Sequence, residues 1–381
     1  MKILFLSSSS GSRGGGEIFL LYLGAALKSG GHTVGLWTSR HPRMDELAEK
    51  FARIGEVWRG NYRNTYDQWH RGVLTSHDPD VTRELAAICA AWRPDVLHVN
   101  KQNLEDGNDL LAAATQLSVP HLCTVHITQP ARFLGARFAA WRDRAARKAL
   151  QSYRAPLVAV APTRVDELRA FLGPAADVRL VVNGVPPSEV DVIDRDALRA
   201  SEGISPGAFA VVAVGRLEPQ KRPLRFLDHA QHISQAIRGA TFSWIGDGRM
   251  AQAWDETVQR RDLAESVRRV GWRDDVRRVL PAYDFFLHCA AYEGLPLALL
   301  EAMDAGLPCA IEVTVHRQLP APLQSCAIAI EDSLDWRAVL ADCQRLRDLG
   351  QRAQQTVRAE FSTAAMARGY EKIYAGLLGR R

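Results

Sequence analysis

The stretch of residues 293–308, EGLPLALLEAMDAGLP, constrains the fold more than any other part of the chain. Pro296 stands where we predict the first helical residue, because its fixed φ suits a helix and its missing N–H would be unpaired there. Good helix formers follow, and Gly306, with Pro308 just beyond it, predicts a left-handed helix end. The stretch therefore predicts a helix that starts abruptly after the apolar strand at residues 285–288.

The start of this helix suits an anionic ligand. A helix N-terminus presents unpaired N–H groups and a partial positive charge, which favour a group such as a diphosphate. Glu293 lies just before the helix, and Glu301 lies roughly one and a half turns inside it. We expect sugar hydroxyls at Glu293, phosphates at the helix start and a ribose at Glu301. The alternative is an ordinary amphipathic helix, since Glu is common on solvated helix faces.

The string Glu293-x7-Glu301, in its Gly, Pro and Glu-Ala-Met context, resembles the signature of retaining glycosyltransferases of family 4. The resemblance implies an α/β protein with the GT-B fold, in which two Rossmann-like parallel-sheet domains face a central cleft. It implies an acceptor-side domain at 1–185, a nucleotide-sugar-binding domain at 186–360, and a C-terminal helix at 361–381 that packs back on the first domain. It also assigns donor contacts to Glu293, Gly294, Leu295, Pro296, Leu297 and Glu301.

Composition limits the other classes of protein. The chain has 381 residues, of which 47% are hydrophobic and 24% charged, which is typical of a globular protein of two domains. A formal charge of +5 permits an anionic ligand but does not indicate nucleic acid. The six cysteines show no zinc-type spacing and are predicted to be reduced core residues. The N-terminal apolar run is too short for a secretory signal and nothing is long enough to span a membrane, so we expect a cytoplasmic protein.

The N-terminal pattern is a strand at residues 3–6, a glycine-rich loop and a helix. A dinucleotide fingerprint fails because Arg13 stands where a Gly is required, and no acid follows the next strand at 33–37. We therefore reject a dehydrogenase. The loop resembles the glycine-rich loop of family 4, and Gly15 and Gly16 are predicted to let the backbone approach the donor. A flexible tight turn is the alternative.

Two further strands, at 95–100 and 121–126, end in polar residues. Ligands bind at the carboxyl ends of strands in open α/β sheets, so His98, Asn100 and His126 are candidate site residues. His126 ends a Thr-Val-His string that resembles the family's active-site histidine, which makes it a predicted catalytic residue. His98 and Asn100 are predicted acceptor contacts, with Trp69 from an aromatic-rich loop within a largely helical 40–90 region. The alternatives are hydrogen-bonded structural residues and aromatic packing.

Residues 132–154 are strongly basic, with six Arg and one Lys against the single acid Asp143. Leu134, Phe138 and Trp141 are spaced by four and three, which predicts one apolar helical stripe. A basic amphipathic helix can lie on an anionic membrane surface, here the inner face of the membrane. An ordinary domain helix with solvated cations is an equal alternative.

The second half repeats the strand–loop–helix pattern. The strand at 209–214 leads into GRLEPQKR, which resembles the family's phosphate-binding loop. Arg216 offers a planar fork to phosphate oxygens and Lys221 offers a point charge. Gly246 belongs to a Gly-Asp-Gly turn similar to the family's donor-binding turn. Residues 309–330 depart from the family pattern, so the resemblance gives no prediction for the rim of the donor pocket.

The resemblance implies transfer of a sugar, with retained configuration, from a UDP- or GDP-linked donor to a glycan, lipid-linked or small-molecule acceptor in polysaccharide or glycoconjugate biosynthesis. His126, Glu293, Arg216 and Lys221 are the predicted catalytic residues. We expect no metal or other cofactor. The side-chain cations Arg216 and Lys221 can already neutralise the phosphates, and both Asp-x-Asp strings lie in linker-like stretches. The alternatives are a non-catalytic nucleotide- or glycan-binding relative, a GT-B sugar-nucleotide epimerase and a phosphorylase.

Overall fold

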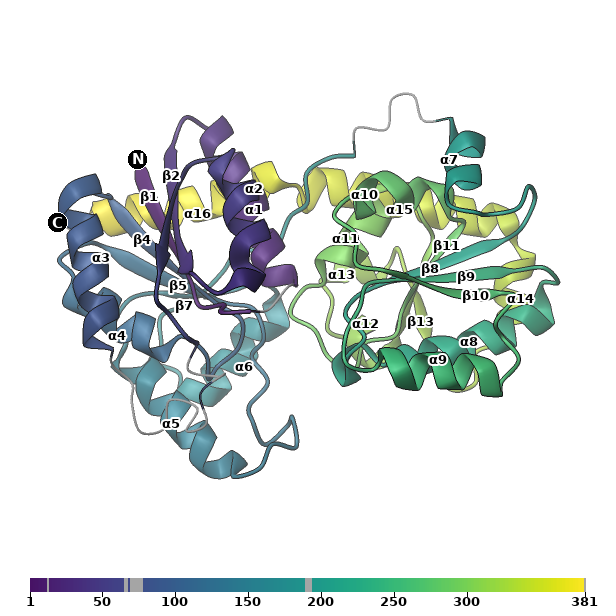
Figure 1. Ribbon diagram of the computed structural model, residues 1–381, viewed down its shortest axis with the longest axis horizontal. Helices are drawn as coiled ribbons and strands as arrows, with labels where there is room; N and C mark the ends of the chain where they lie inside the picture. The colour runs from purple at the N-terminus through teal and green to yellow at the C-terminus, as the bar shows by residue number, and fades with distance from the viewer. Residues whose placement is uncertain (12–13, 65–67, 69–77, 189–193, 380–381) are drawn as a thin grey trace. The chain divides into compact units, whose positions relative to one another are not determined.

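The computed structural model describes residues 1–11, 14–64, 68, 78–188 and 194–379. The chain divides into two compact units (Figure 1). The first consists of Met1–Asn183 and Thr363–Arg381, and the second is Gly184–Ser362. The sequence analysis placed each division two residues away, after residue 185 and before residue 361.

The first unit contains a seven-stranded parallel sheet with the order β3-β2-β1-β4-β5-β6-β7. Its central strands are apolar on both faces, as parallel sheets covered by helices require, and Ile3 to Leu6 are fully buried. The strands are β1 (Lys2–Ser7), β2 (Thr33–Ser39), β3 (Glu56–Gly60), β4 (Val96–Lys101), β5 (His121–Val125), β6 (Leu157–Ala159) and β7 (Val178–Leu180).

Helices cover both faces of this sheet. Figure 1 shows α1 and α2 on one side and α3 and α4 on the other. The C-terminal helix α16 packs beside α1, so the end of the chain completes the first unit. The helices are α1 (Gly15–Ser29), α2 (Asp45–Ala52), α3 (Pro79–Trp92), α4 (Asn108–Gln116), α5 (Ala139–Ser152), α6 (Pro162–Leu172) and α16 (Thr363–Leu378), with a 3-10 turn η1 (Pro42–Met44).

The second unit contains a six-stranded parallel sheet with the order β10-β9-β8-β11-β12-β13. Because β8 and β11 are neighbours, the loops at their carboxyl ends meet although about 75 residues separate them. The strands are β8 (Ala210–Val214), β9 (Thr241–Ile245), β10 (Val267–Gly271), β11 (Phe285–His288), β12 (Cys309–Glu312) and β13 (Ile328–Ile330).

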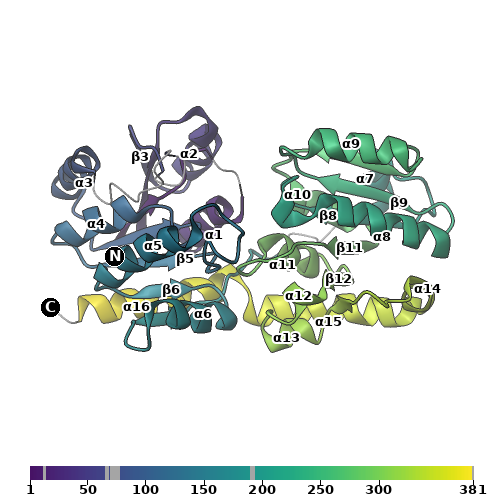
Figure 2. The ribbon, with the colours of Figure 1, turned by 90° about the horizontal axis from the view of Figure 1, so that it is seen from below.

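The second sheet is also covered on both sides, with α8 and α9 on one side and α11 and α15 on the other in Figure 1. Helix α13 packs against α15 (Figure 2). The helices are α7 (Arg195–Ser201), α8 (Pro223–Ala236), α9 (Ala251–Arg260), α10 (Val276–Val279), α11 (Leu297–Asp304), α12 (Val313–His316), α13 (Ala321–Gln324), α14 (Trp336–Ala341) and α15 (Cys343–Glu360), with 3-10 turns η3 (Pro219–Lys221) and η4 (Leu280–Ala282).

Two side chains of α15 bind the C-terminal end of α11. Gln354 Nε2 donates to the carbonyl oxygen of Asp304 at 2.8 Å, and Arg358 Nε pairs with the Asp304 carboxylate at 3.2 Å. A helix C-terminus leaves carbonyl groups unsatisfied and carries a partial negative charge, so these donors suit it. Gly306 follows with φ 79°, which confirms the predicted left-handed end. Pro296 is the N-cap rather than the predicted first helical residue, and α11 begins at Leu297.

The structure corrects the prediction of one amphipathic helix over residues 132–154. Helix α5 starts only at Ala139, after a turn in which Gly135 has φ 64° and Phe138 has φ 57°. These left-handed residues break the helical path, so Leu134, Phe138 and Trp141 do not share one helical stripe. The short strands β3, β10, β12 and β13 were not predicted, and β3 interrupts the region expected to be helix and loop.

The cysteines differ partly from their prediction as core residues. All six lie in described positions and are free thiols. Four are buried, whereas Cys89 is half-buried and Cys343 is exposed on α15. Within the described part of the chain, no helix combines the length and the apolar character that crossing a membrane requires.

Candidate functional site

The loop after β8 carries two cations and is fixed by close backbone packing. Gly246 has φ 134°, and a Cβ there would lie 2.1 Å from the carbonyl oxygen of Gly215. Trp244 Nε1 donates to the same Gly215 oxygen at 2.8 Å. The glycine at 246 is therefore explained by the approach of these two loops, and its predicted contact with the donor stays a prediction. The packing presents Arg216 and Lys221 at the carboxyl end of β8.

The segment after β11 is tied to this loop by hydrogen bonds. The backbone N–H of Ala291 donates to the carbonyl oxygen of Gln220 at 2.8 Å, and Gln220 Nε2 donates to the carbonyl oxygen of Tyr292 at 3.1 Å. Lys221 Nζ then forms an ion pair with Glu293 Oε1. The structure thus brings two predicted catalytic residues, Lys221 and Glu293, into direct contact.

Glu293 is held as a carboxylate. Its side chain is buried, and burial alone would raise its pKa. The charge of Lys221, together with the nearby ring of His288, outweighs burial and lowers the pKa of Glu293 to about 2. Glu293 is therefore ionised at neutral pH and can accept hydrogen bonds from hydroxyl groups but cannot donate a proton.

The start of α11 lies directly after Glu293, Gly294 and Leu295. The N-cap residue is Pro296, and no side chain in the described structure caps the helix. The first N–H groups of α11, beginning at Leu297, are therefore available to an anion, and the helix dipole favours negative charge there. Glu301 is buried one turn further along the helix, and its predicted ribose contact stays a prediction.

Arg216 differs from Lys221 in having no ion-pair or hydrogen-bond partner for its side chain among the described residues. Its guanidinium is half-buried on the loop after β8. A planar guanidinium in this position can bind two oxygens of a phosphate group at once. Arg216, Lys221 and the open start of α11 thus supply three sources of positive potential at the carboxyl ends of neighbouring strands.

The remaining predicted site residues belong to the first unit. A Cβ on Gly16 would meet the amide end of the Gln102 side chain, with Oε1 at 2.0 Å, so this side chain would have to move, whereas a Cβ on Gly15 would meet open space. Both stay predicted donor contacts. Trp69 lies outside the described residues.

His98, a predicted acceptor contact, is fully buried beneath α16. Its Nδ1 is 2.7 Å from the hydroxyl of Tyr374 and its Nε2 is 2.7 Å from Thr124 Oγ1. Both ring nitrogens are occupied by protein groups, and burial lowers the pKa of His98 to about 3. Its place matches the alternative of a hydrogen-bonded structural residue, because the ring holds α16 on the sheet.

His126 and Asn100 lie together at the carboxyl ends of β5 and β4. His126 Nε2 is 2.8 Å from Asn100 Oδ1, and Asn100 Nδ2 donates to the carbonyl oxygen of Gly16 at 3.1 Å. Because Asn100 Oδ1 must accept, Nε2 of His126 carries the proton and Nδ1 is the acceptor. Burial lowers the pKa of His126 to about 4, so the ring is neutral at pH 7 and can accept a hydrogen bond.

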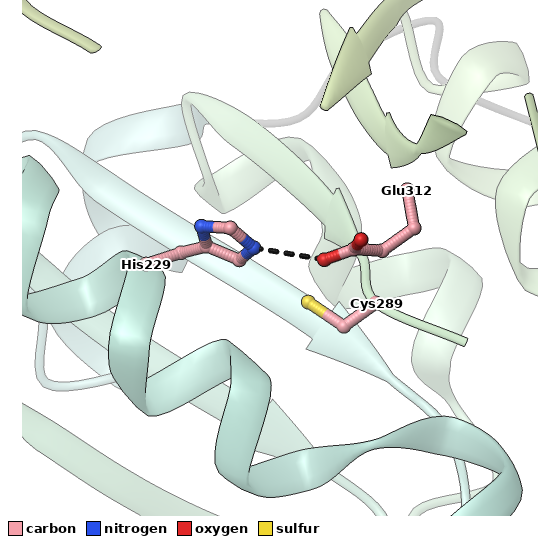
Figure 3. Close-up of side chains that lie close together, drawn as sticks. All are labelled: His229, Cys289 and Glu312. Carbon is pink, nitrogen blue, oxygen red and sulfur yellow. Dashed lines mark hydrogen bonds and ion pairs between the residues drawn. The ribbon is translucent and has the colours of Figure 1, made fainter. Parts of the chain in front are cut away.

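A group of side chains in the second unit resembles a metal site in residue type. His229, Cys289 and Glu312 are buried, and their ligand atoms lie within 4.8 Å of one another (Figure 3). His229 Nε2 is 3.0 Å from Glu312 Oε1, which also accepts from Arg225 Nε at 2.9 Å.

The charges around this cluster oppose a cation. Burial alone would raise the pKa of Glu312, but hydrogen bonds from His229 and Arg225 lower it, and burial raises the pKa of the Cys289 thiol well above its usual value. A cation would have to displace a guanidinium and a proton. We interpret the cluster as an internal ion pair that joins α8 to the ends of β11 and β12.

The two Asp-x-Asp strings are helix caps. Asp78 Oδ1 accepts from the backbone N–H groups of Asp80 and Val81 at the start of α3. Asp194 Oδ1 accepts from Asp196 and Ala197 in the same way at the start of α7. A carboxylate is a preferred N-cap, so a structural role accounts for both aspartates.

Comparisons with known proteins place the chain in a family. The model described as "Glycosyltransferase Family 4" matches residues 13–189, and the model described as "Glycosyl transferases group 1" matches residues 208–321. The chain is 37% identical, over 29% of its length and 29% of the relative's, to the UDP-Gal:alpha-D-GlcNAc-diphosphoundecaprenol alpha-1,3-galactosyltransferase of Escherichia coli. It is 24% identical, over 58% of its length and 60% of the relative's, to the N-acetyl-alpha-D-glucosaminyl L-malate synthase of Bacillus anthracis. Each match thus covers less than two thirds of the curated relative.

Solved structures agree on the fold. Anabaena HepE, in a complex with UDP and glucose, superposes with a TM-score of 0.77 at 18% identity, covering 99% of this chain and 100% of the other. WaaG, a glycosyltransferase of lipopolysaccharide biosynthesis, superposes with a TM-score of 0.69 at 14% identity, with 99% and 100% covered. Two parallel-sheet α/β units and these neighbours define a GT-B protein. The chain belongs to the family 4 glycosyltransferases.

The sequence analysis missed His288, the last residue of β11, whose Nε2 lies 3.5 Å from Glu293 Oε1. It also missed Gln220, which ties the two loops together. An apolar strand that ends in a polar residue five positions before Glu293 was the available indication for His288.

Proposed function

We propose that this protein is a glycosyltransferase that moves a sugar from a nucleotide-sugar donor to a glycan, lipid-linked or small-molecule acceptor. The observation that carries the proposal is the contact between Lys221 and Glu293 beside the uncapped start of α11. A cation, a buried carboxylate and free backbone N–H groups match the diphosphate and the hydroxyls of a nucleotide sugar. Membership of family 4 supports the same activity.

The mechanism follows from where charge develops. Departure of the nucleoside diphosphate places negative charge on its phosphates, and Arg216, Lys221 and the α11 N–H groups are preorganised to stabilise that charge. Glu293, which is ionised, accepts hydrogen bonds from the sugar and orients it. His126, which is neutral, accepts a hydrogen bond through Nδ1. We propose that configuration is retained, with the leaving phosphate taking the proton of the acceptor hydroxyl.

We propose that the reaction needs no metal ion. Both aspartates that could begin an Asp-x-Asp metal site cap helices, and the cations of the β8 loop can neutralise the diphosphate. The His229–Cys289–Glu312 cluster is surrounded by arginines and does not suit a divalent cation.

The names of similar proteins indicate which compounds to try first. The Escherichia coli relative is named for UDP-Gal and a diphosphoundecaprenol acceptor, and Anabaena HepE was solved with UDP and glucose. These names favour a UDP-linked donor for this chain over a GDP-linked one. The acceptor stays open, because the Bacillus anthracis relative is named for L-malate, a small molecule.

A donor panel tests the activity. We expect one or more of UDP-glucose, UDP-galactose, UDP-N-acetylglucosamine and GDP-mannose to raise the melting temperature of the protein and to be hydrolysed or transferred, since a ligand that binds only the native state stabilises it. The rate should survive excess EDTA. Complete loss that magnesium reverses would contradict the metal-free mechanism. Binding of a nucleotide sugar with no turnover under any condition would instead favour a non-catalytic relative.

We also propose contact with an anionic membrane surface through α5 and the turn before it. Phe133, Phe138 and Trp141 are 59%, 66% and 59% exposed, which is unusual for large apolar side chains. Exposed cations surround them, at Arg132, Arg137, Arg144, Arg147 and Lys148. Although these rings do not form one helical stripe, exposed aromatics among cations suit the interface of an anionic bilayer.

Vesicle co-sedimentation tests this contact. We expect the protein to sediment with vesicles of 30% phosphatidylglycerol and not with pure phosphatidylcholine. The double variant Phe138→Ser, Trp141→Ser should reduce partitioning by about tenfold or more, because it removes two apolar anchors. Trp272→Ser, which removes a 40%-exposed ring from the second unit, is the matched control and should bind as the wild type does. Equal binding by all three proteins, or none by the wild type, would contradict the proposal.

A further inference from the structure

His288 occupies an unusual position beside the predicted catalytic carboxylate. It is the last residue of β11 and is only 3% exposed. Its Nε2 lies 3.5 Å from Glu293 Oε1, and within the described structure this buried nitrogen has no hydrogen-bond partner. A buried ring nitrogen without a hydrogen bond is energetically unfavourable. The 3.5 Å contact with Glu293 compensates this cost only weakly.

One oxygen of Glu293 is shared by two groups. Oε1 forms the ion pair with Lys221 Nζ and is also the atom that His288 Nε2 approaches. Lys221 forms the ion pair with this oxygen, and the ring nitrogen of His288 lies 3.5 Å from it. His288 is therefore a second possible donor to the Glu293 carboxylate, which is paired with Lys221.

Under the proposed function, Lys221 binds the diphosphate of the donor as well as Glu293. A diphosphate carries more negative charge than a single carboxylate and attracts the ammonium group more strongly. If Lys221 turned to the diphosphate with nothing in its place, Glu293 would stay buried as an unpaired charge, which is strongly unfavourable. The nearest described side chain that can replace Lys221 is His288, because the amide of Gln220 already donates to Tyr292.

Resting on the proposed function, we propose that His288 is a positioning residue that takes over Glu293 when the diphosphate of the donor draws Lys221 away. Nε2–H of His288 then donates to Oε1, and Oε2 stays directed to the hydroxyls of the donor sugar. The same exchange lowers the cost of binding any nucleoside diphosphate, because it gives the buried carboxylate a hydrogen bond in place of the ion pair that it loses.

A double-mutant cycle in the full-length chain tests the exchange. Isothermal titration with UDP, or with GDP if the wild type binds only GDP, would be measured for His288→Met in the wild-type and Glu293→Gln backgrounds. Met fills the space of the ring but has no N–H. We expect His288→Met to weaken UDP binding about tenfold when Glu293 is present, which is the effect of one lost hydrogen bond to a charged group. In the Glu293→Gln background we expect less than a twofold effect, since no charge is left to pair.

The variant His288→Gln keeps an N–H donor at a similar reach and should retain affinity within about threefold of the wild type. Equal losses from His288→Met in both backgrounds would show that the ring only packs, and no loss in either would show that Glu293 does not need it. Either result overturns the inference while leaving the proposed function intact. A wild type that binds neither UDP nor GDP would instead count against the proposed function.

Discussion

Replacing Arg216 or Lys221 by Ala should lower turnover by about 10²-fold or more, the size of the effect of removing one donor that stabilises charge in a transition state. Both residues lie on the loop after β8, beside the open start of α11. Their positive charge opposes the barrier that arises as the diphosphate leaves. The measurement is kcat with a saturating nucleotide sugar chosen from the donor panel, for each folded variant.

The two variants should differ in stability. Lys221→Ala removes the ion-pair partner of buried Glu293, whereas Arg216 has no side-chain partner in the described structure, so only the first should lower the melting temperature. Arg238→Ala is the matched control, because Arg238 is exposed and precedes β9 at the opposite end of the sheet. It removes the same charge and should leave kcat unchanged. Near-wild-type turnover by a folded Arg216 or Lys221 variant would refute the role in phosphate binding.

Replacing Arg142 by Ala should destabilise the first unit by about 3–5 kcal/mol, the usual cost of breaking a buried ion pair by removing one partner. The Arg142 guanidinium donates from Nε and Nη2 to both oxygens of Glu105, at 2.5 and 2.6 Å. Both side chains are less than a tenth exposed. Losing the fork would leave the carboxylate of Glu105 charged and buried. Urea unfolding of the variant and the wild type measures the difference.

Arg144→Ala is the control for this prediction. Arg144 lies on the same helix but is exposed, so its loss should change the unfolding free energy by less than about 0.5 kcal/mol. A comparable loss from both variants would mean that the ion pair contributes nothing specific. The result also separates the two uses of the basic segment, because Arg142 serves the fold and only its exposed neighbours are available to a membrane.

The sequence predicted several of the elements that carry the candidate site. Strand β11 was predicted with its observed bounds, and the left-handed end at Gly306 followed from a glycine placed between helix formers and a proline. These features depend on local preferences, so they can be recognised without knowing the rest of the fold. The loop cations Arg216 and Lys221 were found from their place at a strand end together with the resemblance of their loop to the phosphate-binding loop of the family.

Local patterns failed where distant contacts decided the outcome. Residues 132–154 have the composition of one helix, yet left-handed residues at Gly135 and Phe138 start α5 later. His98 has the position of a site residue, but Tyr374, 276 positions away, occupies its ring. Strands β3, β12 and β13 are stabilised by pairing with neighbouring strands, which their local sequence does not report.

The sequence by itself determined the repeated strand–loop–helix plan, the two cations after β8 and the helix that begins after Glu293. Only the tertiary structure decided that Lys221 and His288 share one oxygen of Glu293. The physical reason is that residue type and spacing report the preferences of a short segment. Which charge meets which carboxylate depends on strand order, since β8 and β11 become neighbours only when the sheet forms.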